Sequence, residues 1–151
     1  MRSTVDIGAQ PNPGSKLTAQ GSELLFVYGS LRRGFDHHYL LRQLRAEFIG
    51  RGKVRGELFD LGRYPGAVKS DSSNTVSGEI YRLKSPDSDL KALDDYEGVG
   101  STTETQKSEY RRELTQVTIE DSGAITDAWI YWMNCDLPEK HRIASGDYSK
   151  G

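Results

Sequence analysis

Apolar runs separated by turn-forming residues divide most of the chain into short strands and two helices. The first run, Leu24–Tyr28, is continuous and predicts a strand that is buried on both faces. Residues 48–61 mix glycines and β-forming residues with charges, which predicts a half-buried strand containing bulges. Residues 76–83 predict another strand. Tyr110–Glu120 and Ala124–Asn134 flank the turn Asp-Ser-Gly and predict a pair of strands.

The helical segments carry recognisable start and stop signals. Asp36 is a candidate N-cap for a first helix with apolar residues from Tyr39 onward. Ser85 is a candidate N-cap for a second helix, with proline at the first helical position and Gly98 at its end. Only one crossover helix follows the first strand, which excludes a doubly wound array. The order predicts an α+β fold with a mixed sheet that can curl into a small barrel.

Length and composition indicate one domain in a reducing compartment. The chain has 151 residues, a formal net charge of -2 and one cysteine, Cys135. Residues 1–22 are rich in Pro, Gly, Ser and Gln, without apolar periodicity, and predict a disordered tail before a single domain at 23–151. No run approaches the roughly 20 apolar residues that a membrane span needs. We therefore expect a cytoplasmic protein without a membrane partner.

Several candidate chemistries have a simpler explanation. Basic residues between Arg32 and Arg55 are interrupted by acids, and the acidic pI of about 5.9 does not favour RNA binding through the region Arg42–Arg55. Arg32 and Arg33 could attract an anionic substrate, but we interpret them as solvated loop charges. His37 and His38 are adjacent, so they would point about 100° apart on a helix and do not form a metal pair. Ser30 has no orienting His motif that would make it a nucleophile. We expect no metal, no cofactor and no nucleic-acid partner.

One carboxylate in the second helix lies on an unexpected face. Leu90 and Leu93 mark the core face, and Glu97 continues this stripe, while Asp94 and Asp95 are surface-type acids beside or opposite it. An inward glutamate at a helix C-terminus has its pKa raised by desolvation and by the helix dipole, which suits a proton acceptor. The alternative is a residue at the rim of the core that reaches water or pairs with an arginine such as Arg111. The helical pattern leaves both interpretations open.

A set of short motifs, taken together, points to a known family. The strings FVYGSLRRG, YPGAV, GEIY, LDDYEGV, YRR and SGD occur in this order between residues 24 and 148. In order and spacing they resemble the γ-glutamylcyclotransferase-like superfamily, which includes the AIG2-like proteins and γ-glutamylamine cyclotransferase. A lone Tyr-Gly-Ser-Leu would be weak evidence. Its combination with an acidic motif at the end of a helix is more specific.

The resemblance implies a fold, a reaction and a set of site residues. The fold would be a small closed mixed β-barrel with flanking helices. The reaction would be cyclisation of a γ-glutamyl amine or peptide to 5-oxoproline with release of the amine, without cofactor or metal. Glu97 would be the general base and acid, and Tyr28, Gly29, Ser30 and Leu31 would hold the substrate. Tyr110, which opens YRR, would close one wall of the site.

Some features depart from the family pattern and leave alternatives open. The chain has Tyr148 in SGDYSKG where bacterial members often have SGDW, so the packing of the C-terminal arm is an open question. The segment Gly100–Glu109 is longer and more polar than in compact members, so substrate size does not follow. A non-catalytic module of the same fold that binds an amino-acid-like ligand is the alternative function, although such a module would be expected to have lost Glu97. The oligomeric state, monomer or homodimer, stays undetermined.

Overall fold

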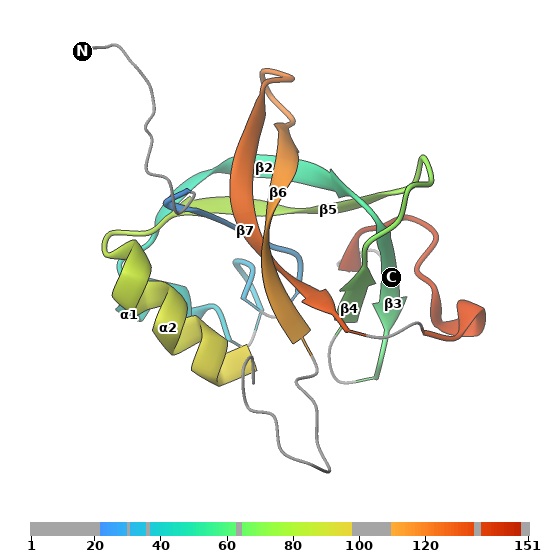
Figure 1. Ribbon diagram of the computed structural model, residues 1–151, viewed down its shortest axis with the longest axis horizontal. Coiled ribbons are helices and arrows are strands. Elements are labelled where there is room, and N and C mark those ends of the chain that lie inside the picture. Colours follow the sequence, from blue (N-terminus) through green and yellow to red (C-terminus); the bar gives the residue numbers. More distant parts are fainter. Residues whose placement is uncertain are drawn as a thin grey trace.

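Five strands of the computed structural model close into a barrel (Figure 1). The structure describes residues 22–29, 31–35, 37–62, 65–97, 110–134 and 137–148. In barrel order the strands are β1 (Leu24–Val27), β5 (Thr75–Arg82), β2 (Glu47–Arg55), β6 (Tyr110–Ile119) and β7 (Ile125–Met133). Neighbouring strands are antiparallel except β1 and β7, which close the barrel in parallel through Leu25 and Trp129. The predicted α+β fold with a small closed mixed barrel is confirmed.

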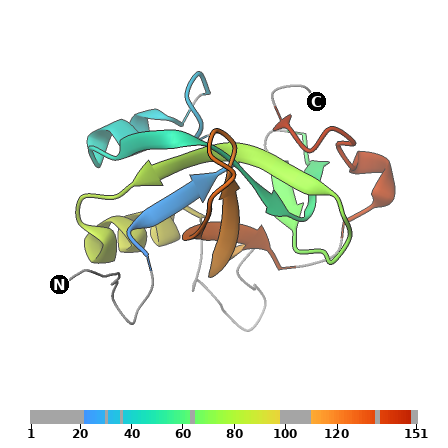
Figure 2. The ribbon, with the colours of Figure 1, turned by 90° about the horizontal axis from the view of Figure 1, so that it is seen from above.

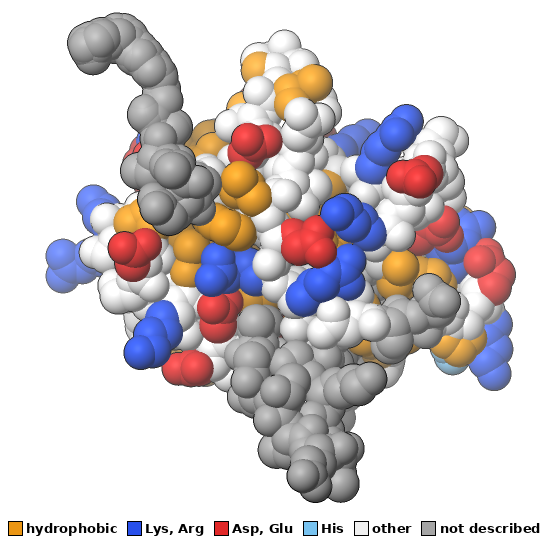
Figure 3. Space-filling view, viewed as in Figure 1, with side chains coloured by type: hydrophobic (Ala, Val, Ile, Leu, Met, Phe, Trp, Pro, Cys, Tyr) orange, Lys and Arg blue, Asp and Glu red, His pale blue; other side chains and the backbone are white. Residues whose placement is uncertain are grey.

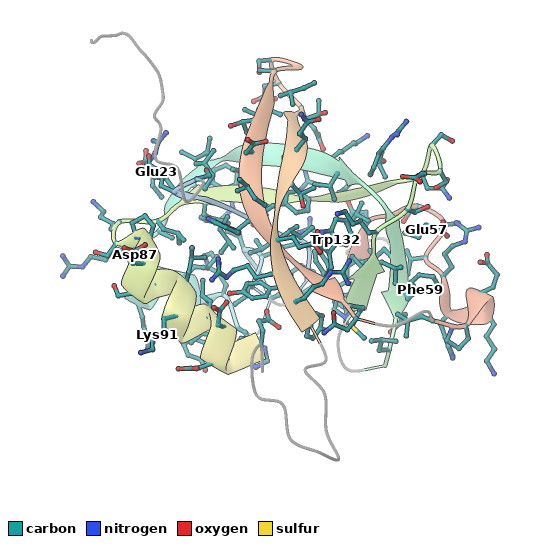
Figure 4. All side chains as sticks on the ribbon, in the orientation of Figure 1. Glu23, Glu57, Phe59, Asp87, Lys91 and Trp132 are labelled. Atoms are coloured by element: carbon teal, nitrogen blue, oxygen red, sulfur yellow. The ribbon has the colours of Figure 1, made fainter. Side chains whose placement is uncertain are left out.

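The barrel is filled with side chains from alternating strand positions. Phe26, Ile80, Ile130 and Trp132 are almost completely buried and belong to one cluster. Figure 4 labels Trp132, a residue of β7, in the middle of the molecule. Gly78 is required for closure, since a Cβ there would lie 2.3 Å from the Val27 carbonyl oxygen. The interior is therefore a packed core, and the site must lie at the edge of the barrel or outside it.

The strand expected over residues 48–61 is in fact two strands in different sheets. It contains the expected bulge, between Phe48 and Gly50, but β2 ends at Arg55 and the chain leaves the barrel. β3 (Glu57–Asp60) then pairs with β4 (Pro65–Val68) in a separate two-stranded sheet. A Cβ at Gly56 would lie 2.9 Å from the Val68 carbonyl oxygen and 3.0 Å from the Trp132 ring. The break follows from this close tertiary approach, which the local pattern does not encode.

Two helices cover the outer face of β1 and β5, at the end of the molecule away from β3 and β4 (Figures 1 and 2). They are α1 (Tyr39–Gln43) and α2 (Pro86–Glu97). Leu41, Leu90 and Leu93 are buried in a second cluster with β1 and β5 side chains. As predicted, α2 begins directly after Ser85. Figure 4 shows Asp87 and Lys91 on the side of α2 that faces away from the barrel.

The C-terminal arm closes the other side of the barrel. After a 3-10 turn, η2 (Glu139–His141), the Ile143 N–H donates to the Leu58 carbonyl at 2.7 Å. The Ser77 N–H donates to the Gly146 carbonyl, also at 2.7 Å. Gly146 has a φ of +71°, and a Cβ there would lie only 2.0 Å from the Thr75 carbonyl oxygen. The motif SGD therefore needs its glycine so that the arm can lie against β5.

Several expectations concern residues outside the described ranges. These are the tail up to residue 21, the helix stop at Gly98, the segment Gly100–Glu109, Cys135 and Ser30. They stay predictions. The expected cap at Asp36 is wrong, because the N-cap position of α1 is His38. No helix in the described part of the chain is long and apolar enough to cross a membrane.

Candidate active site

The site is built around the end of β1, where the motif YGSL begins. Tyr28 turns its side chain into the barrel core and is 6% exposed. Its hydroxyl donates to the Tyr131 carbonyl at 2.6 Å and accepts the Ala67 N–H at 3.3 Å. Burial raises the pKa of this phenol far above its usual value, so the hydroxyl stays protonated. Tyr28 thus joins the end of β1 to β7 and β4 and holds the segment that follows.

We call the segment Tyr28–Leu31 the cradle. A Cβ on Gly29 would lie 2.7 Å from Cγ of Pro65, so a glycine is needed for position 29 to lie this close to the start of β4. Tyr110 reaches the same residue, since its hydroxyl donates to the Pro65 carbonyl at 3.1 Å. Leu31 is 4% exposed and packs in the second core cluster, the one that contains the buried leucines of α1 and α2 (the outer cluster). The groups that Leu31 can offer to a ligand are therefore those of its main chain.

Glu97 is the last residue of α2 and its side chain is half-buried. Its charge raises the pKa of the Tyr28 phenol, after the larger effect of burial. The same charge contributes to the raised pKa of Tyr131, after burial and the hydrogen bond to Asp94. The Glu97 carboxylate is thus close enough to act electrostatically on the side chain that starts the cradle. The two segments that sequence analysis singled out lie in one region of the fold.

Asp94 does not occupy the surface position that we expected. It is half-buried and forms a bidentate ion pair with Arg112. Nε of Arg112 lies 2.7 Å from one carboxylate oxygen and a terminal nitrogen lies 3.0 Å from the other. The Tyr131 hydroxyl also donates to Asp94, at 2.7 Å. The Arg112 guanidinium lies 4.5 Å from the centre of the Trp129 ring. This corrects the sequence prediction, which considered only the helical wheel and not the β6–β7 hairpin that packs on this side.

Arg111, the arginine considered as a partner for Glu97, has other partners on β6 and β7. It binds the Glu113 carboxylate and donates to the Met133 carbonyl at 3.0 Å. Lys69 binds the same Glu113 at 2.7 Å. Figure 3 shows that basic and acidic side chains are interspersed on this side of the molecule, so neither sign dominates there.

A second buried carboxylate, Glu79, lies beneath the loop that follows the cradle. It is 4% exposed and stands opposite Val27 in the β1–β5 register. Its Oε1 accepts the Arg33 N–H at 3.0 Å and the Tyr81 hydroxyl at 2.9 Å. The sequence did not lead us to predict this role, because we interpreted GEIY only as a family motif. The signal available was the two-residue period, which places Glu79 and Tyr81 on one face of β5.

Arg32 is not the solvated charge that we expected. It is 3% exposed, and its guanidinium binds the buried Asp147 carboxylate at 3.0 Å. This pair joins the loop after the cradle to the SGD motif of the C-terminal arm. Tyr148 then stacks on Phe35 with ring centroids 5.7 Å apart, which shows how a tyrosine is accommodated at this position. Arg33 remains 57% exposed, in agreement with the expectation for that residue.

The described residues contain no cluster of three His, Cys, Asp or Glu side chains that could hold a metal ion. His38 uses its ring Nδ1 in a 2.9 Å hydrogen bond with the Leu31 carbonyl. The residues brought together at the cradle are a glutamate, tyrosines and main-chain groups. This set can bind and transfer protons and can orient an anionic ligand.

Comparison with known proteins places this arrangement in a family. A family model described as gamma-glutamyl cyclotransferase, AIG2-like, matches residues 25–150. A candidate gamma-glutamylcyclotransferase of Methanocaldococcus jannaschii is 32% identical over 131 residues, covering 83% of this chain and 95% of that protein. A candidate gamma-glutamylcyclotransferase of Vibrio cholerae is 37% identical over 131 residues, covering 83% and 94%. Gamma-L-glutamyl-butirosin B gamma-glutamyl cyclotransferase of Niallia circulans is 31% identical over 114 residues, covering 74% and 67%.

Solved structures agree with this assignment. An AIG2-like protein from Mus musculus is 26% identical with a TM-score of 0.68, covering 87% of this chain and 91% of that one. YkqA from Bacillus subtilis is 28% identical with a TM-score of 0.64, covering 85% of this chain but only 40% of YkqA. The chain belongs to the gamma-glutamyl cyclotransferase, AIG2-like family, and it is a γ-glutamylcyclotransferase-like enzyme.

Proposed function

We propose that the enzyme cyclises the γ-glutamyl group of a γ-glutamyl amine or γ-glutamyl peptide to 5-oxoproline, with Glu97 as general base and acid. The α-amine nitrogen of the substrate attacks the γ-carbonyl carbon, and the bond from that carbon to the leaving nitrogen breaks. The products are 5-oxoproline and the free amine. Because the substrate carries its own nucleophile, the protein needs to orient it and to move protons from the attacking nitrogen to the leaving nitrogen.

The observation that carries this proposal is the chain of hydrogen bonds from the Tyr28 hydroxyl to the Tyr131 carbonyl and from the Tyr131 hydroxyl to Asp94, three residues before Glu97, whose charge contributes to the raised pKa of Tyr28. It links the end of α2 to the end of β1, which are far apart in the sequence. The α-amine of a γ-glutamyl group is protonated at neutral pH, so it must lose a proton before it can attack. A glutamate beside the substrate can accept this proton and then donate it to the leaving nitrogen. The attacking nitrogen gives up its second proton as the lactam forms, and the departing amine or water takes it. One carboxylate therefore suffices for both halves of the transfer.

The cradle is proposed to bind the substrate through main-chain N–H groups. The Tyr28 side chain is committed to the barrel core and the Leu31 side chain to the outer cluster. The Arg32 N–H donates to the Gly29 carbonyl at 3.0 Å, and the Arg33 N–H donates to Glu79. The donors that we assign to the substrate are therefore the main-chain N–H groups of the cradle, which precede Arg32 in the sequence. They would bind the α-carboxylate or the negative charge that develops on the γ-carbonyl oxygen.

A substrate screen with 5-oxoproline release as the readout tests the proposal. The panel contains γ-glutamyl amines, γ-glutamyl dipeptides and glutathione, and the free amine is measured in parallel. We expect one 5-oxoproline for each amine released, from at least one class of substrate. Stabilisation of the fold by 5-oxoproline or glutamate without turnover of any substrate would instead support the binding module. Stabilisation by nucleotides alone would contradict both functions.

A further inference from the structure

The proposed mechanism uses Glu97 but leaves a second acid on the same helix unexplained. Asp94 precedes Glu97 by three residues, so the two carboxylates lie on neighbouring positions of one helix face. Asp94 is half-buried and accepts hydrogen bonds from Arg112 and Tyr131. A planar guanidinium bound through two nitrogens holds a carboxylate in a defined orientation. Such a site on the helix turn that carries Glu97 calls for a function.

We propose that Asp94 and Arg112 are positioning residues for Glu97, which anchor the last turn of α2 and balance the charge around its carboxylate. This inference rests on the proposed role of Glu97. The end of a helix lacks intrahelical partners for its last carbonyl groups and frays easily. Arg112 in β6 ties this end to the barrel, and its guanidinium is itself held against the Trp129 ring. The anchor restricts where the Glu97 carboxylate can lie relative to the cradle.

The same network extends to the cradle through one residue. Tyr131 donates its hydroxyl to Asp94, and its main-chain carbonyl accepts the Tyr28 hydroxyl at 2.6 Å. The end of α2 that carries Glu97 and the start of the cradle are therefore both hydrogen-bonded to Tyr131 of β7. A displacement of α2 that separates Asp94 from Tyr131 would move Glu97 away from Tyr28. Misplacement of a reacting group by about 1 Å can cost roughly a hundredfold in rate.

The charged groups on α2 and on the strands packed against it form pairs of opposite charge. Asp94 on its own helix is negative and Arg112 on β6 is positive, and the hydrogen bond to Asp94 raises the pKa of Arg112. Tyr28 after β1 and Tyr131 on β7 are neutral, because burial raises the pKa of both phenols. On β5, Glu79 is paired with the loop through Arg33. Loss of one member of the Asp94–Arg112 pair would leave an unbalanced charge beside the base.

The test compares the pH profile of kcat/KM for variants of the pair. Asp94→Asn leaves the positive Arg112, which favours the ionised base, so the acidic limb should move to lower pH by about half a unit to one unit. Arg112→Gln leaves the negative Asp94, so the limb should move to higher pH by a similar amount. The double variant should return the limb to its wild-type position. We expect kcat to fall about 10- to 100-fold in all three, because the helix end is released.

Three control variants distinguish the effect of releasing the helix end from the effect of removing a charge. Asp95→Asn removes the same charge from the adjacent, exposed residue, and Arg111→Gln removes the neighbouring arginine of β6, which binds Glu113. Both should keep the wild-type pH profile and kcat. Arg112→Lys keeps the charge without the two-point contact, so kcat should fall while the acidic limb stays in place. This variant also serves if Arg112→Gln does not fold.

A purely structural pair would lower the melting temperature and leave both kcat and the acidic limb unchanged. That result, or equal shifts in Asp94→Asn and Asp95→Asn, would overturn the inference. The role of Glu97 is judged separately. An active Glu97→Gln enzyme would refute the proposed function, whereas an inactive Glu97→Gln enzyme with unshifted Asp94 and Arg112 variants would refute only the positioning role.

Discussion

The buried ion pair between Arg32 and Asp147 should make a large contribution to stability when one partner is removed. Their side chains are 4% and 8% exposed, and their nitrogen and oxygen atoms are 3.0 Å apart. Nε of Arg32 has no hydrogen-bond partner among the described residues, so this guanidinium depends strongly on Asp147. In Asp147→Asn the buried charge of Arg32 would lose its counter-ion while the shape of the site is kept.

The expected cost of Asp147→Asn is about 3 kcal/mol of unfolding free energy, at the lower end of the range for a broken buried pair. The lower end applies because Arg51, which binds the other oxygen of Asp147 at 3.3 Å, is 39% exposed and well hydrated. For a domain of this size the melting temperature should fall by roughly 10 °C. The loss should also appear as a lower midpoint in urea with an unchanged slope.

Two further variants determine whether the charge is responsible. The double variant Arg32→Met, Asp147→Leu removes both charges and should recover most of the stability, since a well-packed apolar pair can replace a buried ion pair. Arg51→Gln, at the partly exposed arginine, should cost less than about 1 kcal/mol. A single Asp147→Asn variant within 1 kcal/mol of wild type would refute the reasoning, because it would mean that Arg32 finds water or another acceptor.

Three other predictions follow from single features of the structure. Tyr28→Phe should cost about 1–3 kcal/mol in urea unfolding, because the Tyr131 carbonyl and the Ala67 N–H lose their buried hydroxyl partner; a neutral effect would mean that water replaces it. Hydrogen bonds from Lys69 and Arg111 lower the pKa of Glu113, so its stabilisation is present above the unfolded value near 4.5 and is lost as pH falls through the lower folded value. The stability difference between wild type and Glu113→Gln, roughly 0.5–1 kcal/mol at pH 7, should therefore shrink below pH 4.5, and a constant difference would contradict this pairing. A chain that starts at Ser22 should melt within a few degrees of full length, because residues 1–21 have the composition of a tail. Ser22 is kept because its carbonyl accepts a hydrogen bond from the Trp129 ring. A large fall in melting temperature would show that the preceding residues pack on the barrel.

The strands of the barrel and the second helix could be predicted from the sequence because their signals are local, whereas closure of the barrel was implied by the family resemblance. Alternating strands, the Ser85–Pro86 start and the Leu90–Leu93 stripe each involve neighbouring residues, and the structure agrees with them. The same stripe predicted that Glu97 can face the core, and the structure shows its side chain half-buried. The separate β3–β4 sheet could not be predicted, because it depends on the approach of Trp132 to Gly56 from a distant strand.

The charged part of the site was the least predictable. Asp94 and Arg32 look like ordinary surface charges until their partners, Arg112 and Asp147, are known. These partners come from β6 and from the C-terminal arm, far away in the sequence. No local period or cap marks such a pair. The family motifs FVYGSLRRG, LDDYEGV, YRR and SGD contained these residues, but the motifs alone did not show that they bind one another.

The most direct test of the account is Glu97→Gln, measured for turnover, product binding and stability on one preparation. Glutamine keeps the size of the side chain but cannot accept a proton, so turnover should fall about 10²–10⁴-fold. Binding of 5-oxoproline should be retained, because the cradle is unchanged. The melting temperature should hold or rise slightly, since a negative charge is removed from the C-terminal end of a helix. An enzyme with nearly wild-type turnover and a lower melting temperature would contradict the assignment of Glu97 as the base.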